Sequence, residues 1–139
     1  ISWGELYTSL QQGVVDAAEN NTPSFYLSKH YEVCKYYTVD EHNMIPDVIL
    51  SSTNLWNNLT NNERKWLQEA VNLSISFQRE LWIKSEEESM RAIINDGVEI
   101  IYPEKDLFKK ASLPMYDKLK EDKEINNLII RIKDEKIKN

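Results

Sequence analysis

Cysteine, glycine and proline are scarce in this chain of 139 residues, and acidic residues outnumber basic ones. The one cysteine, Cys34, excludes a disulfide within the chain. Three glycines and four prolines allow few tight turns, so we expect long elements of secondary structure. Seventeen basic residues against twenty-three acidic ones give a net charge of −6, without a basic stripe to neutralise phosphates. Nucleic acid is therefore not an expected partner.

Long apolar runs are also missing. No run approaches the roughly 20 apolar residues of a membrane span, so this segment is not expected to insert into a membrane. The chain starts with Ile1 rather than methionine and carries no secretory leader pattern. We expect residues 1–139 to be a fragment of a longer protein, in which an export signal could lie upstream.

The sequence offers one very strong helix signal. Thr60 and Glu63 have the spacing of a capping box, and no glycine or proline follows them up to position 95. A helix over 60–95 would be about 50 Å long, which exceeds the roughly 30 Å diameter of a small compact domain. Such a helix is expected to protrude, to kink or to span two bodies. Its apolar stripe recurs at helical spacing: Trp66, Ala70, Leu73, Phe77 and Leu81.

Shorter elements surround this helix. A helix over 2–12 is expected, because Ser2 and Glu5 also have capping-box spacing and Gly13 is a natural stop. Further elements follow from apolar periodicity and turn residues: a helix over 22–29 with Thr22 as its N-cap, strands over 32–40, 48–52 and 98–102, a helical turn over 54–58, and helices over 106–119 and 123–136. This order predicts a helix-rich α/β fold. Because three short strands offer little sheet surface, we expect residues before Ile1 to supply the rest of the sheet.

The most unusual stretch is WGELYTSLQQGVVDAAENN, from Trp3 to Asn21, which gathers neutral amides beside aromatic rings without a nucleophile–base pair. It resembles the signature of the DctP family, the extracytoplasmic solute-binding proteins of tripartite ATP-independent periplasmic (TRAP) transporters. That signature is an aromatic residue followed by E-[LV]-Y-x-[AS]-L-Q-x-G-x-V-D-[GA]-x-E-N. The matching residues are Trp3, Glu5, Leu6, Tyr7, Ser9, Leu10, Gln11, Gly13, Val15, Asp16, Ala17, Glu19 and Asn20. The downstream stretches HYEVCKYYTV, EHNMIPDVILSS and GVEIIYPE follow the family's order as well.

The resemblance implies the C-terminal portion of a two-lobed periplasmic-binding-protein fold, type II-like, in which one very long helix spans the lobes. It implies a receptor that binds a small organic acid, performs no chemistry, uses no cofactor or metal, and delivers the acid to TRAP membrane subunits. Such receptors are periplasmic or extracytoplasmic. In the family, an arginine that clamps the ligand carboxylate precedes the signature. It would therefore lie upstream of Ile1, together with the N-terminal lobe.

Three ligand-binding residues carry over from the resemblance. Asn20 matches the closing asparagine, whose amide would donate to the ligand carboxylate. Trp3 matches the opening aromatic residue and would form an apolar wall against the ligand's carbon skeleton. Asp47 matches a position where members vary the side chain; it can accept hydrogen bonds from hydroxyls and would repel a second carboxylate. Asp47 thus favours a uronate or other sugar acid, with a C4-dicarboxylate as the alternative.

Each of these residues also has an ordinary structural interpretation. Asn20 could cap the helix that follows it, Trp3 could belong to the core, and Asp47 could be a solvent-facing turn residue. His42, in a loop, is expected to be structural, and Cys34, in an apolar run, is expected to be a buried thiol.

Two further function classes stay open. A hydrolase or lyase could use Asp16, Glu19 and His42, provided that these side chains reach one substrate atom. The long helix could also be an interaction surface, for example for a homodimer, and that role could coexist with a receptor.

Overall fold

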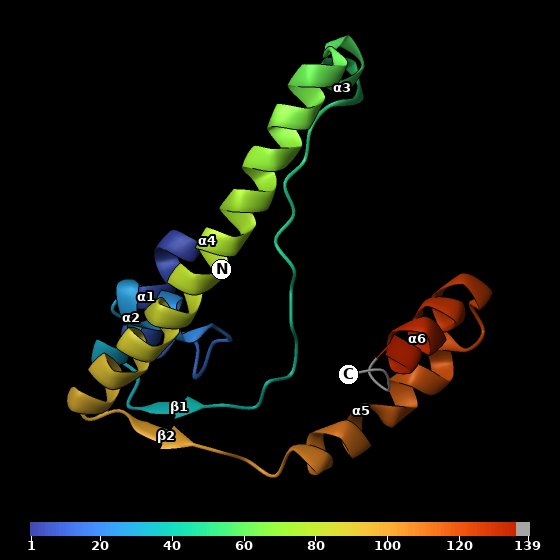
Figure 1. Ribbon diagram of the computed structural model, residues 1–139. Coiled ribbons are helices and arrows are strands. Elements are labelled where there is room, and N and C mark those ends of the chain that lie inside the picture. The colour runs from blue at the N-terminus through green and yellow to red at the C-terminus, as the bar shows by residue number, and fades with distance from the viewer. Residues whose placement is uncertain (136–139) are drawn as a thin grey trace. The chain divides into compact units, whose positions relative to one another are not determined.

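The computed structural model describes residues 1–135 (Figure 1). The chain divides into two compact units after Ile101, and each unit is described by itself. None of the described helices is both long and apolar enough to cross a membrane.

The first unit is dominated by α4 (Asn61–Asn95), a helix of 35 residues that runs the length of the unit (Figure 1). The predicted capping box is confirmed: the Thr60 hydroxyl accepts a hydrogen bond from the Glu63 backbone N–H at 3.3 Å, and the Glu63 carboxylate accepts one from the Thr60 N–H at 2.7 Å. The short helix α3 (Thr53–Asn58) precedes it, as predicted. After the helix, Gly97 has a φ of 85°, which favours glycine and ends the element.

The helix α1 (Trp3–Gln11) lies where the sequence predicts it, and Gly13 ends it with a φ of 69°. The predicted capping box of Ser2 and Glu5 is wrong in detail. Ser2 is the N-cap residue, but its side chain makes no capping bond to the backbone. Its hydroxyl instead donates to the Glu5 carboxylate at 2.8 Å. The Glu5 backbone N–H donates to the Ser2 carbonyl oxygen at 3.0 Å rather than to the serine hydroxyl.

The next elements are α2 (Thr22–Leu27) and the 3₁₀ helix η1 (His30–Glu32). The prediction of Thr22 as the N-cap of α2 is wrong by one residue. The side-chain oxygen of Asn21 accepts a hydrogen bond from the Ser24 backbone N–H at 2.9 Å and so caps the helix. Asparagine is among the strongest N-cap residues, because its short side chain reaches the free N–H groups of the first turn.

The strands β1 (Tyr36–Thr38) and β2 (Glu99–Ile101) form a two-stranded parallel sheet, in which Tyr37 lies opposite Ile100. Parallel strands need a long crossover, and α3 and α4 occur within it. The predicted strand over 48–52 is wrong: this segment has no regular structure and is exposed. Within the described residues the sheet contains two strands only, so this apolar stretch has no partner there.

The core of the first unit is small. Phe25, Ile93 and Val98 are its buried apolar residues, and they join α2 to the C-terminal half of α4 and to the start of β2. The apolar stripe of α4 was expected to pack in a core or across two lobes, and within this unit Trp66 and Leu73 are exposed. Burial is therefore confined to one end of the long helix.

The second unit, from Tyr102 onward, contains α5 (Lys105–Leu119) and α6 (Lys123–Glu135). Both helices were predicted, and α5 continues through Pro114. The last residue of the predicted helix, Lys136, lies outside the described residues. The periodicity of α6 predicts an inward face of Ile125, Leu128, Ile129 and Ile132. Ile129 is half-buried, and the other three are exposed.

Candidate functional site

The site is built around Asn20, which lies in the loop between α1 and α2. Its neighbour Asn21 already supplies the N-cap of α2 through its side chain. The capping role that the sequence left open for Asn20 is thus taken by another residue. The Asn20 carboxamide is left to point elsewhere.

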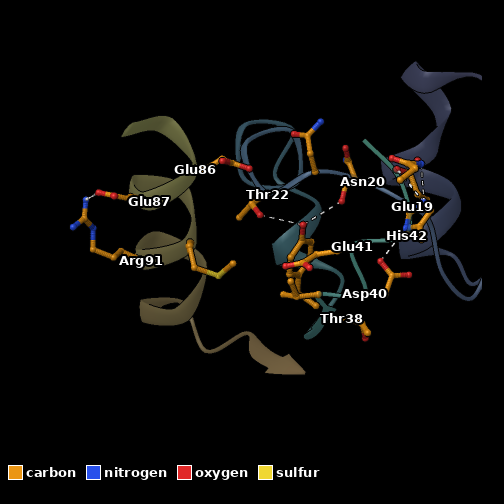
Figure 2. Close-up of a pocket in the computed structure, with 15 residues that line it drawn as sticks. Glu19, Asn20, Thr22, Thr38, Asp40, Glu41, His42, Glu86, Glu87 and Arg91 are labelled. Atoms are coloured by element: carbon orange, nitrogen blue, oxygen red, sulfur yellow. Dashed lines mark hydrogen bonds and ion pairs between the residues drawn. The ribbon is translucent and has the colours of Figure 1, made fainter. Parts of the chain in front are cut away.

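The backbone of Asn20 is anchored by Tyr37 on β1. The Tyr37 hydroxyl donates to the Asn20 carbonyl oxygen at 3.2 Å and lies 3.1 Å from the hydroxyl of Thr22 (Figure 2). Because a carbonyl oxygen only accepts, Tyr37 donates its hydroxyl hydrogen to Asn20. The Thr22 hydroxyl therefore donates in the bond between Thr22 and Tyr37. Burial raises the pKa of Tyr37, which keeps this hydroxyl protonated and able to donate.

The side chains of Asn20 and Trp3 meet at one imidazole. The Asn20 Nδ2 lies 3.4 Å from the His30 Nδ1, and the Trp3 and His30 ring centroids are 5.4 Å apart in an edge-to-face arrangement of 61°. His30 itself is only 3% exposed, and this burial lowers its pKa. Trp3 is 58% exposed, so it is no core residue and presents an open aromatic face. Two of the three residues expected to bind ligand are therefore held together.

The third expected residue, Asp47, is placed differently. It lies in the exposed segment between β1 and α3. It lines neither of the two cavities described below. The structure thus brings Trp3 and Asn20 together, and it does not bring Asp47 to them.

Sequence reasoning missed His30 and Tyr37. Both lie in the stretch HYEVCKYYTV, which the resemblance marked only as a strand. A histidine or a tyrosine inside an aromatic run is ordinarily core, and its periodicity does not say which polar atom it will meet. The one signal that could have marked them was that the signature and this stretch follow each other in the same order in the family.

Asn20 lines two adjoining cavities. One, of about 690 Å³, also contains His30 and Cys34 in its wall. Cys34 is half-buried rather than buried, and its pKa is raised by desolvation. The other cavity, of about 630 Å³, extends from Asn20 to α4 (Figure 2). Volumes of this size suit a small organic molecule.

The second cavity has an acidic wall. Glu86 extends from α4 toward the loop that carries Asn20, whereas Glu87 and Arg91, which also line the cavity, lie on the outer side of the helix (Figure 2). Arg91 pairs with Glu87 at 3.9 Å, so the arginine partly neutralises that carboxylate. Further acids come from the loops: Glu19, Asp40 and Glu41. A wall of carboxylates accepts hydrogen bonds from hydroxyls and disfavours a second negative charge on a bound molecule.

His42 lies between two carboxylates. Its Nδ1 is 2.9 Å from Asp40 Oδ1 and its Nε2 is 3.8 Å from Glu19 Oε1. The hydrogen bond that the His42 Nδ1–H donates to the Asp40 carboxylate raises the pKa of His42 and lowers the pKa of Asp40. Asp16, the other member of the catalytic alternative, lines the larger cavity together with Glu19 and His42. Glu19 and His42 are at ion-pair distance but beyond hydrogen-bond reach of each other.

We predict that the substitution Asp40→Asn lowers the pKa of His42 toward its ordinary value of 6.5. Since the pKa of His42 is raised and that of Asp40 is lowered, the stabilisation from this pair is complete between about pH 4 and pH 6.5. It is lost as the pH rises through the folded pKa of His42 or falls through that of Asp40. A proton NMR titration of the His42 ring measures the shift directly. Glu69→Gln removes a charge from a pair with Lys65 on the distal part of α4 and should leave this titration in place. An unchanged pKa in Asp40→Asn would contradict the assignment.

Among residues 1–135, no group of three or more histidine, cysteine or acidic side chains is placed to hold a metal ion.

Comparison with known proteins identifies the family. The family described as "Bacterial extracellular solute-binding protein, family 7" (DctP) matches residues 1–123. An uncharacterized protein of Salmonella typhimurium, YiiZ, is 39% identical over 133 residues, which cover 95% of this chain and 41% of that relative.

Two solved structures are also similar. A TRAP periplasmic solute-binding protein of Chromohalobacter salexigens with bound D-glucuronate matches with a TM-score of 0.90 and 35% identity, over 96% of this chain and 45% of that chain. One from Sulfitobacter with bound β-D-galacturonate matches with a TM-score of 0.84 and 36% identity, over 93% of this chain and 43% of that chain. The chain thus spans less than half the length of these relatives.

These likenesses and the length of α4 confirm the predicted fold class, a helix-rich α/β portion of a two-lobed solute-binding protein with one very long helix. Both solved relatives are named as periplasmic solute-binding proteins, and a further relative is the C4-dicarboxylate-binding periplasmic protein DctP of Rhodobacter capsulatus. The chain belongs to the DctP family of bacterial extracellular solute-binding proteins.

Proposed function

We propose that this chain forms the C-terminal part of an extracytoplasmic receptor for a sugar acid, with a uronate as its ligand. The observation that carries the proposal is the meeting of Trp3 and Asn20 at the buried His30, in a chain whose solved relatives hold glucuronate and galacturonate. An amide donor beside an exposed aromatic face suits reversible capture of an acid with a carbon ring.

Charge favours a sugar acid over a C4-dicarboxylate. The cavity wall that extends from Asn20 to α4 carries Glu19, Asp40 and Glu86. These side chains can accept hydrogen bonds from the several hydroxyls of a uronate, whereas a second carboxylate would be repelled. Asp47 is proposed as a further hydroxyl acceptor from the segment between β1 and α3. The C4-dicarboxylate receptor stays the alternative, because relatives of that name exist in the family.

The rest of the assembly is proposed from the family. The chain spans less than half the length of its relatives, so an N-terminal lobe with a carboxylate-binding arginine would complete the site. The receptor would deliver its ligand to TRAP membrane subunits in the periplasm without changing it chemically. The exposed stripe of α4 leaves a homodimer as a further proposal, and sedimentation of the complete protein showing monomer alone would overturn it.

The test is binding by the complete protein that contains this chain. Calorimetry should show saturable binding of D-glucuronate or D-galacturonate, and weaker binding of succinate. A ligand that binds only the folded state stabilises it by about 2.7 kcal/mol at 100 times its dissociation constant, which a thermal-shift assay detects. D-Glucose is the matched control, since it keeps the ring and hydroxyls but lacks the carboxylate. Absence of any shift with uronates at millimolar concentration would overturn the proposal, and preference for succinate would favour the alternative.

A further inference from the structure

His30 is the most enclosed polar residue at the site. Its imidazole contacts Trp3 on its edge, and its centroid lies 6.4 Å from that of Tyr7 on a second side. The Asn20 carboxamide meets its Nδ1 at 3.4 Å. With an exposure of 3%, the ring has little freedom to turn. The His30 ring therefore connects α1, the loop between α1 and α2, and η1 at one point.

In the hydrogen bond between Asn20 and His30, the donor is the carboxamide and the acceptor is the ring. A carboxamide NH₂ group can only donate, so the His30 Nδ1 must accept, and the neutral ring must carry its proton on Nε2. A reversed carboxamide would present its oxygen and would require the other tautomer, with the proton on Nδ1. The orientation of the Asn20 amide and the tautomer of His30 are therefore coupled, and the amide orientation in the structure corresponds to the Nε2–H tautomer. Burial favours the neutral ring, because the charged form loses its hydration.

We infer that His30 is a positioning residue of the acid-binding site: its Nδ1 takes one amide hydrogen of Asn20 and fixes the other for the ligand carboxylate, while its ring holds Trp3 against the same ligand. This inference rests on the proposed function, since it specifies how the two proposed contacts are kept in register. The donor is then already oriented when ligand arrives, so less ordering is needed on binding.

A matched pair of variants separates orientation from packing. His30→Phe keeps an aromatic ring against Trp3 and removes the acceptor. His30→Asn loses the ring but places an oxygen near the position of Nδ1. At pH 7.5 we expect His30→Phe to raise the dissociation constant for D-glucuronate about fivefold, the effect of one ordinary hydrogen bond. His30→Asn should recover most of that loss. Tyr7→Phe, which keeps the second ring contact and removes a hydroxyl bonded to Glu32, should bind as the unaltered protein does.

A measurement without ligand tests the same contact. Long-range ¹H–¹⁵N NMR of the complete protein should show the Nε2–H tautomer of His30, with Nδ1 unprotonated. An Nδ1–H tautomer would overturn the inference, as would equal affinities in all three proteins when His30 is Phe, Asn or unaltered. If the unaltered protein binds no acid at all, it is the proposed function that fails, and the tautomer still decides whether His30 orients Asn20.

Discussion

Replacing Asn20 by aspartate is expected to abolish useful affinity for the acid. The substitution Asn20→Asp keeps the size and shape of the side chain but exchanges an amide donor for a carboxylate, which cannot donate to the ligand. The loss of a hydrogen bond to a charged group, with repulsion between two carboxylates added, amounts to about 3–4 kcal/mol, or a rise in the dissociation constant of roughly 100-fold to 1000-fold. Calorimetry of the complete protein with D-glucuronate measures this.

The adjacent residue provides a matched control. Asn21→Asp adds the same charge one position away and keeps the cap of α2, because aspartate and asparagine are similarly good N-caps. Asn21 also lines the smaller cavity, but its side-chain oxygen is engaged with the Ser24 N–H. We therefore expect this variant to fold normally and to lose much less affinity than Asn20→Asp.

Equal losses in the two variants would contradict a direct contact at Asn20 and would leave only a general effect of negative charge. A loss of folding in Asn20→Asp, seen by circular dichroism, would show that Asn20 is needed for the fold and would not support a role in ligand binding.

The sequence predicted the long helix well because its signals are local. A capping box at Thr60, an uninterrupted run and Gly97 after the last turn all act within a few residues. The strand over 48–52 failed for the opposite reason. A strand exists only when a partner strand pairs with it, and apolar composition says nothing about where that partner is.

The candidate site was predicted in part. The signature marked Trp3 and Asn20, and the structure places both side chains on His30. The imidazole itself escaped prediction, because its role depends on a contact between residues ten positions apart in a loop and a 3₁₀ helix. Asp47 was carried over by alignment alone, and no local signal fixes where an exposed loop residue points.

The extent of burial could not be read from periodicity either. The stripe of α4 has helical spacing from end to end, but only Ser89 and Ile93, near its C-terminus, are buried in the described chain. Periodicity shows which face of a helix is apolar, and it does not show which part of that face is covered.

The largest loss of stability is expected from Ile93→Ala. Ile93 is completely buried between Phe25 and Val98, so truncation removes apolar contacts and leaves a cavity in a small core. Isoleucine-to-alanine changes in such positions cost about 2–5 kcal/mol, and we expect about 3 kcal/mol here. The core also reaches the site, because the Phe25 ring lies 5.0 Å from the Tyr37 ring, whose hydroxyl anchors Asn20.

Its neighbour is the control. Ile94→Ala removes the same atoms from the same helix, but Ile94 is 49% exposed, and alanine is the better helix former. We expect a change below about 1 kcal/mol at this position. Urea denaturation of the complete protein, followed by circular dichroism, compares the two. Coincident midpoints would mean that Ile93 is no core residue. A lower midpoint for Ile93→Ala, with weaker glucuronate binding, would instead show that the end of α4 supports the loop that carries Asn20.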